Sequence, residues 1–176
     1  MDFKLLKLNL KIAWFKLSGR LSHSDQIINF SSAKIRSPKV LIVFPVKEHH
    51  ASTAMKYVSD VIDIFSEDDA EFSLIINSSY KNSIKLYNIS VHTYNANKNG
   101  HVTNLGDIIN QIYLNKYDII IDMNVKFNIE IAMLINELNS NYKIGFRSNF
   151  SDLFYNIQLK HNKNNNGYKA IKNILS

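Results

Sequence analysis

The residues of this chain that could do chemistry lie mostly in two short segments, PVKEHHAST at 45–53 and DMN at 122–124. In the first segment Glu48 precedes two adjacent histidines, His49 and His50. An imidazole can act as a general base near neutral pH, and a neighbouring carboxylate can orient it. Glu48 and His50 are therefore the candidates for a catalytic base. The alternative is that a histidine pair at the start of a helix simply faces solvent.

Other polar side chains near these segments could bind a ligand without transforming it. Asp122 and Asn124 follow one apolar run, and Arg147 follows the next, which ends at Gly145. Asp122 has a second interpretation, because a carboxylate placed there can also cap the helix that follows. The ligand-binding candidates are Lys47, His49, Asp122, Asn124 and Arg147.

Several kinds of site are excluded by composition and motif. The sequence has no cysteine, so a disulfide, a thiolate nucleophile and a cysteine-based zinc site are ruled out. Neither HExxH nor GxSxG occurs, and the five glycines are too scattered for a GxGxxG loop. We therefore expect no metal site and no bound cofactor.

The elements that must position these residues follow from hydrophobic periodicity. Residues 39–44 and 117–122 are apolar on every face, as in central strands that helices cover on both sides. Apolar residues between them recur at helical spacing, most clearly at 52–65. We expect further strands at 72–76, 89–94 and 154–159 and helices at 79–87, 105–114 and 167–175. This alternation predicts an α/β fold with a doubly wound, mainly parallel, Rossmann-like sheet.

The predicted topology places the candidate residues on one rim. Loops that follow adjacent parallel strands open at the same edge of a sheet, which is where α/β proteins bind ligands. If 39–44 and 117–122 are neighbours, the segment 48–50 should come within reach of Asp122 or Asn124.

Charge divides the chain into a basic leader, 1–38, and a single α/β domain, 39–176. Residues 1–40 hold eight basic and two acidic side chains, and their net charge of +6 equals that of the whole chain. The remainder is neutral. A nucleic-acid-binding domain carries its basic residues on the folded face that meets phosphate, so no nucleic-acid partner is expected.

The leader predicts a helix with two apolar stripes. One contains Leu10, Trp14 and Leu17, and the other contains Ile12 and Phe15. The helix could lie on an anionic membrane surface or pack on the body. It lacks the uninterrupted apolar region of a signal peptide, so we expect a cytoplasmic protein, peripheral to the inner membrane if the helix takes the first of these two arrangements. The membrane-contact candidates are Lys4, Lys7, Lys11, Trp14, Lys16 and Arg20.

Taken in order, the segments KVLIV at 39–43, YDIIIDMN at 117–124, YKIGFRSN at 142–149, FYNIQL at 154–159 and NGYKAIKNIL at 166–175 resemble the amino-terminal domain of the heptosyltransferase family of GT-B glycosyltransferases. Short bacterial chains with a basic leader and one such domain look similar. The resemblance covers about residues 39–175. It implies half of a two-domain enzyme, the half that holds the lipopolysaccharide acceptor while the other half binds the nucleotide-sugar.

The chain departs from the family pattern at the site. The family carries a Gly-Asp pair after the first strand, whose Asp deprotonates the acceptor, and an ungapped alignment places His49 and His50 there. We therefore expect a non-catalytic, glycosyltransferase-like binding or scaffolding domain. The alternative is the acceptor-binding subunit of a split glycosyltransferase, completed by a separate donor-binding protein.

Overall fold

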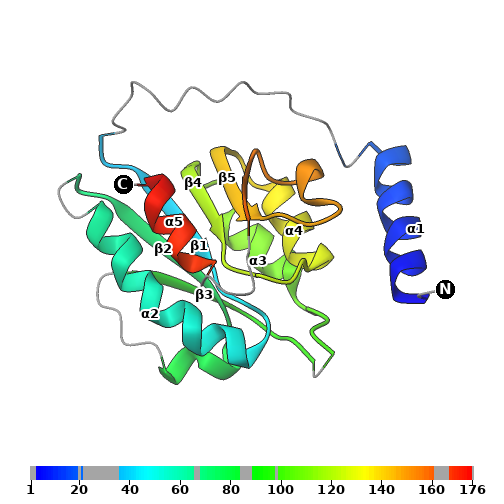
Figure 1. Cartoon of the computed structure of the whole chain (residues 1–176), viewed down its shortest axis with the longest axis horizontal. Coiled ribbons are helices and arrows are strands. Elements are labelled where there is room, and N and C mark those ends of the chain that lie inside the picture. Colours follow the sequence, from blue (N-terminus) through cyan, green and yellow to red (C-terminus); the bar gives the residue numbers. More distant parts are fainter. Residues whose placement is uncertain are drawn as a thin grey trace.

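The computed structural model describes residues 3–19, 21, 36–65, 68–83, 89–97, 99–160 and 167–175, apart from the side chains of 3–5, 82 and 83. Within them the chain forms a six-stranded, all-parallel sheet in the order β3-β2-β1-β4-β5-β6 (Figure 1). The sheet therefore grows outward in both directions from β1, as expected for a Rossmann-like fold. The strands are β1 (Lys39–Val43), β2 (Glu71–Asn77), β3 (Ser90–Tyr94), β4 (Tyr117–Asp122), β5 (Ser140–Phe146) and β6 (Ile157–Leu159).

Helices cover both faces of this sheet. Two of them, α2 and α5, pack against each other on one face, and α3 and α4 share the other. The described helices are α1 (Phe3–Leu17), α2 (Glu48–Ile64), α3 (Leu105–Ile112), α4 (Ile129–Glu137) and α5 (Tyr168–Leu175), with short 3₁₀ turns η1 (Ser78–Ser83) and η2 (Ser151–Leu153). The predicted α/β class and the doubly wound parallel arrangement are confirmed.

The two central strands are neighbours, as their composition requires. β1 pairs with β4 in parallel, with Val40 opposite Ile119 and Val43 opposite Asp122. Residues 40–43 are completely buried because helices cover both faces of the strand. The expectation of adjacent, parallel central strands is confirmed.

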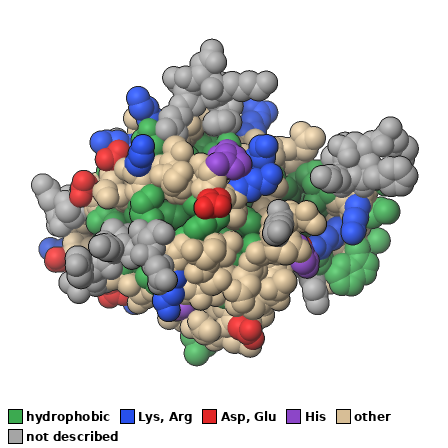
Figure 2. Space-filling model, turned by 90° about the horizontal axis from the view of Figure 1, so that it is seen from below, with side chains coloured by type: hydrophobic (Ala, Val, Ile, Leu, Met, Phe, Trp, Pro, Cys, Tyr) green, Lys and Arg blue, Asp and Glu red, His purple; other side chains and the backbone are tan. Residues whose placement is uncertain are grey.

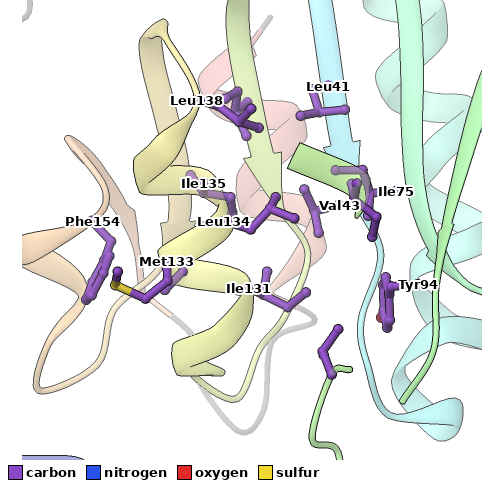
Figure 3. Packing of buried hydrophobic residues seen from close by; sticks show 14 of the residues in the cluster. Leu41, Val43, Ile75, Tyr94, Ile131, Met133, Leu134, Ile135, Leu138 and Phe154 are labelled. Atoms are coloured by element: carbon purple, nitrogen blue, oxygen red, sulfur yellow. The ribbon is translucent and has the colours of Figure 1, made fainter. Parts of the chain in front are cut away.

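Alternation along β1 divides the core into two layers. Leu41 and Val43 point toward α4, where they meet a face that includes Ile131 and Leu134 (Figure 3). Val40 and Ile42 point to the opposite layer, under α2 and α5. A strand with period-two side chains and two apolar layers cannot shift register by one residue without exchanging its faces.

Three element boundaries differ from the expectation. α2 begins at Glu48 rather than near Ser52, so the two histidines belong to its first turn. The sixth strand begins at Ile157 instead of Phe154, because 151–153 form the 3₁₀ turn η2. In place of a helix over 79–87, the structure has η1, and residues 84–88 lie outside the described residues.

The leader helix α1 packs on the body with one of its two apolar stripes. Ile12 and Phe15 are buried, and Phe15 belongs to the core cluster on the α3 and α4 face. None of the helices formed by the described residues combines the length and apolarity that crossing a bilayer requires.

Gly145 in β5 lies under the aromatic ring of Tyr155. A Cβ at this position would come within 2.7 Å of the ring atoms, a distance that real Cβ atoms do not tolerate. The close approach lets Tyr155 lie flat on the strand and point its hydroxyl toward the end of β4. The structure therefore requires glycine at 145 for packing.

We expect Gly145→Val to lower the free energy of unfolding by about 1–3 kcal/mol, because the added side chain displaces the buried ring of Tyr155. The measurement is urea unfolding of the full chain. Gly106→Ala is the matched control, since a Cβ there meets nothing within 4 Å in the first turn of α3. Alanine should be neutral or stabilising by up to about 1 kcal/mol at that position. Equal losses for the two variants would contradict the packing argument.

Candidate functional site

Asn124 joins the loops that follow the two central strands. Its Oδ1 accepts a hydrogen bond from the backbone N–H of Val46 at 2.9 Å, and its Nδ2 donates to the carbonyl of Phe44 at 3.3 Å. The backbone pairing of β1 with β4 ends at Val43 and Asp122, and the side chain of Asn124 continues the connection between the two segments beyond that point. A single amide fixes the loop between β1 and α2 against the loop between β4 and α4.

Asp122 holds Asn124 in this position from inside the protein. The carboxylate is 2% exposed. Its Oδ1 accepts hydrogen bonds from Nδ2 and the backbone N–H of Asn124, at 2.7 and 2.9 Å, and its Oδ2 accepts one from the hydroxyl of Tyr155 at 2.5 Å. Burial raises the pKa of Asp122 above its ordinary value, while these hydrogen bonds oppose that rise.

Two more tyrosines donate hydrogen bonds to backbone carbonyls at this edge. The hydroxyl of Tyr94 donates to Phe44 at 3.3 Å, and that of Tyr168 donates to Met123 at 3.1 Å. Burial, and secondarily the charge of Asp122, raises the pKa of both phenols, so both remain protonated donors. The ends of β1 and β4 are therefore fixed from β3 and from α5.

A pocket of about 220 Å³ opens at this edge of the sheet. This volume is below the range of about 300–1,000 Å³ typical of drug-sized ligands, and it suits one small ring or one end of a longer molecule. None of the lining residues carries a carboxylate. The lining consists of Val46, Lys47, His50, Asn99, Gly100, Asn124, Val125, Lys126, Phe127 and Asn128.

Two walls of the pocket are the loops that follow β1 and β4, and the third wall is the loop between β3 and α3. Ala96 and Val102 form an isolated antiparallel bridge, which turns the chain through Asn99 and Gly100. Gly100 has a φ of +80°, in the region that favours glycine. The side chain of Asn128 donates a hydrogen bond to its carbonyl at 3.0 Å, so the loop is fastened to the start of α4.

Glu130, in the first turn of α4, is the second fastener of this loop. Its Oε2 accepts a hydrogen bond from the backbone N–H of Val102 at 2.8 Å, and its Oε1 contacts Nδ1 of His101. The same oxygen lies 3.7 Å from Nζ of Lys11 in α1. One carboxylate therefore connects the pocket loop, α4 and the leader helix.

Of the residues predicted for the site, the pocket brings together Lys47, His50 and Asn124. Glu48 and His49 are exposed and are not part of the lining. The imidazole rings of His49 and His50 lie 3.9 Å apart, centroid to centroid. The negative charge of Glu48 instead acts on Tyr80 in η1, whose pKa rises chiefly through burial.

Asp122 and Arg147 are not part of the pocket wall. Asp122 lies behind Asn124 and positions it, and Asn128 rather than Asp122 caps α4 by accepting hydrogen bonds from the N–H groups of Glu130 and Ile131. Arg147 is exposed after β5, and its backbone N–H pairs with Leu159.

The sequence reasoning missed the two loops that supply most of the wall, 99–100 and 125–128. The signals were present: NKNG at 97–100 is a turn sequence, and Asn128 precedes an apolar helical run. Of the other candidates, Lys7 and Lys16 are exposed on α1, the side chain of Lys4 is not described, and Arg20 lies outside the described residues. Among the described residues no three His, Asp or Glu side chains form a group that could hold a metal ion.

Comparison with known proteins shows similarity in structure but not in sequence. No protein-family model matches the chain, and no curated protein matches it. A glycosyl transferase family 9 protein from Veillonella parvula superposes with a TM-score of 0.61 at 12% identity, over 82% of this chain and 42% of that one. E. coli heptosyltransferase WaaC, solved with ADP, superposes with a TM-score of 0.58 at 14% identity, over 78% of this chain and 46% of that one. The chain thus has a glycosyltransferase-like fold and spans under half the length of either neighbour.

We expect Tyr155→Phe to lower the free energy of unfolding by about 1–3 kcal/mol at pH 8, because it leaves a buried oxygen of Asp122 without its donor. The raised pKa of Asp122 means that its contribution to stability is complete below the ordinary Asp pKa and declines as pH rises through the folded-state pKa. Removing the Tyr155 hydroxyl raises that pKa further. The loss should therefore be smaller at pH 4 than at pH 8.

The measurement is urea unfolding of wild type and variant at both pH values. Asp122→Asn is the control background, because an amide does not ionise, and there the effect of Tyr155→Phe should no longer depend on pH. A loss in the wild-type background that is equal at the two pH values, or greater at pH 4, would contradict the role given to the carboxylate.

Proposed function

We propose that this protein is a glycosyltransferase-like binding or scaffolding domain, which holds a small anionic saccharide in the pocket at the carboxyl edge of its sheet. The observation that carries the proposal is the pocket lining, which combines two lysines, one imidazole and three asparagines. Asparagine side chains offer both donors and acceptors to sugar hydroxyls. Lysine ammonium groups favour a phosphate or carboxylate on the same ligand.

The position of the pocket supports a binding role. It lies where the loops after β1, β3 and β4 meet, at the edge where doubly wound sheets bind ligands. The N-termini of α2 and α4 also reach it, through Lys47 and Asn128. The partial positive charge of a helix N-terminus adds to the preference for an anion.

The non-catalytic part of the proposal rests on the kind of groups in the lining. A transfer to a sugar hydroxyl needs a base that contacts that hydroxyl. His50 is the one titratable group in the lining other than the lysines, while Glu48 lies outside it and Asp122 is buried behind Asn124. A pocket of this composition is better suited to holding a ligand than to deprotonating it.

The alternative function is that of an acceptor-binding subunit in a split GT-B glycosyltransferase. The observation in its favour is that the chain spans 42% and 46% of the two glycosyltransferase structures named above. In this case a separate donor-binding protein would complete the site, with His50 as the base.

The proposed place of action is the inner face of a membrane, as a peripheral protein. The basic leader supports this, because residues 3–17 contain four lysines and no acidic residue. Anionic leaflets attract such segments by about 1 kcal/mol for each basic residue near the surface.

We expect glucose 6-phosphate, used as the probe, to perturb the backbone amide resonances of residues 99–100 and 124–128 in an NMR titration. Glucose alone and inorganic phosphate alone should bind more weakly, because each meets only half of the lining. Lys47→Ala with Lys126→Ala should weaken binding of the probe about 10-fold or more, since the pair supplies the cationic side chains. Lys116→Ala is the matched control, because this exposed lysine lies at the opposite edge of the sheet. Equal effects of the two sets would contradict the proposed site.

We expect the chain alone not to turn over nucleotide-sugars. The measurement is release of free nucleotide from UDP-glucose or ADP-glucose with glucose 6-phosphate present as acceptor. Turnover that disappears in His50→Ala but persists in His49→Ala would overturn the non-catalytic assignment. Turnover that appears only when a donor-binding protein is added, with the same dependence on His50, would establish the split enzyme.

A further inference from the structure

The leader helix α1 has two apolar faces that meet different environments. Ile12 and Phe15 are 4% and 7% exposed, because they face the body. Leu10, Trp14 and Leu17, spaced i, i+4 and i+7, are 64%, 55% and 88% exposed on the opposite side. The sequence left open whether this helix packs on the body or contacts a membrane, and the structure leaves one face available while the other is docked.

The exposed apolar side chains of the described residues gather on this helix. Among the residues that the structure describes, six large apolar side chains are exposed, and three of them form the outer face of α1; the others are Tyr113, Leu114 and Ile174. At the end of the molecule where α1 lies, green apolar side chains adjoin blue basic ones (Figure 2). An apolar stripe on a surface helix is commonly an interaction site.

The charge around this face selects the partner. Lys7 and Lys16 are exposed on α1, and the helix has no acidic residue to offset them. An apolar stripe with a tryptophan and basic neighbours complements an anionic lipid bilayer, in which the indole takes the interfacial position and the lysines meet the headgroups. A second copy of the chain would bring the same basic side chains together, which disfavours self-association.

The docked helix is also tied to the pocket. Lys11 pairs with Glu130, and Glu130 binds the backbone of Val102 and the ring of His101. Gly100, which directly precedes His101 in that loop, lines the pocket and is held by Asn128. The helix and the pocket wall are therefore connected through one carboxylate.

We propose that the outer face of α1, formed by Leu10, Trp14 and Leu17 with Lys7 beside them, binds an anionic lipid surface while the inner face stays docked on the body. The pair between Lys11 and Glu130 then holds the pocket wall beside that surface. The inference rests on the membrane location given with the proposed function and names the face that would carry it; it does not depend on the ligand assigned to the pocket.

The first test is co-sedimentation of the full chain with vesicles of 3:1 phosphatidylcholine and phosphatidylglycerol, compared with phosphatidylcholine alone. We expect binding to the anionic vesicles alone, and at least a tenfold weaker partition in 0.5 M salt than in 0.1 M salt. Trp14 is the sole tryptophan of the sequence, so a blue shift of its emission reports insertion directly. Equal binding to both vesicles, or binding without a blue shift, would overturn the proposal.

Variants distinguish lipid binding by this face from non-specific adsorption through any exposed apolar side chain. Leu10→Ser with Leu17→Ser should weaken partition at least tenfold. Leu114→Ser removes a leucine on the body that is about as exposed as Leu17, and it should leave the partition to vesicles unchanged. Both variants should keep the binding of glucose 6-phosphate, so that failure of lipid binding and failure of the pocket are distinguishable. A chain that dimerises in solution through α1 and ignores vesicles would also overturn the proposal.

The docked state is tested with a zero-length carbodiimide cross-linker and mass spectrometry. Lys11 and Glu130 lie close enough to be joined, and Lys39 with Glu71, at 3.2 Å on the body, is the internal reference. We expect the ratio of the two cross-links to be unchanged when the chain is bound to anionic vesicles, and Glu130→Gln to remove only the first. Loss of the first cross-link on vesicles would show that the helix leaves the body, which would overturn the docked arrangement.

Discussion

The buried carboxylate of Asp122 is the constraint around which the carboxyl edge of this sheet is arranged. A charge in an apolar interior must be hydrogen-bonded, and here the donors come from Asn124 and from Tyr155. The requirement extends outward, because Asn124 can satisfy Asp122 only in the orientation that also binds Val46 and Phe44. The backbone that borders the pocket is thus fixed from within.

The same arrangement gives the loops of the site fixed hydrogen-bond partners. Two of its three walls are held by side chains from the β4–α4 segment: Asn124 holds the loop after β1, and Asn128 and Glu130 hold the loop after β3 at Gly100 and Val102. The remaining wall, the loop after β4, is held through Asn124 by Asp122. A ligand that meets preordered groups loses less entropy on binding. The carboxylates of the site, Asp122 and Glu130, are used for this scaffolding, and the groups left to face a ligand are amides and cations.

The sequence was sufficient for the sheet and insufficient for the pocket, for a physical reason. Strands such as 39–43 and 117–122 can be recognised in the sequence because burial on both faces requires apolar residues at nearly every position. The pocket depends on which amide reaches which loop, and Asn124, Asn128 and Asn99 look alike in a chain rich in asparagine. The burial of Asp122 could not be predicted from the sequence because its partner, Tyr155, is 33 positions away and reaches it only where Gly145 leaves room.

The pairing of β1 with β4 has a consequence for how the protein is made. β1 can pair with β2 early, but its other neighbour lies about 80 positions further along, and the hydrogen bond from Val46 to Asn124 spans 78. Contacts of such long range form late and slow the folding of a domain. During synthesis on a ribosome, the two halves of the sheet are joined only after β4 has emerged. The carboxylate of Asp122 remains exposed to solvent until Tyr155 has emerged as well. The edge that carries the pocket is therefore completed at a late stage of synthesis, and an intact pocket reports that most of the domain has folded.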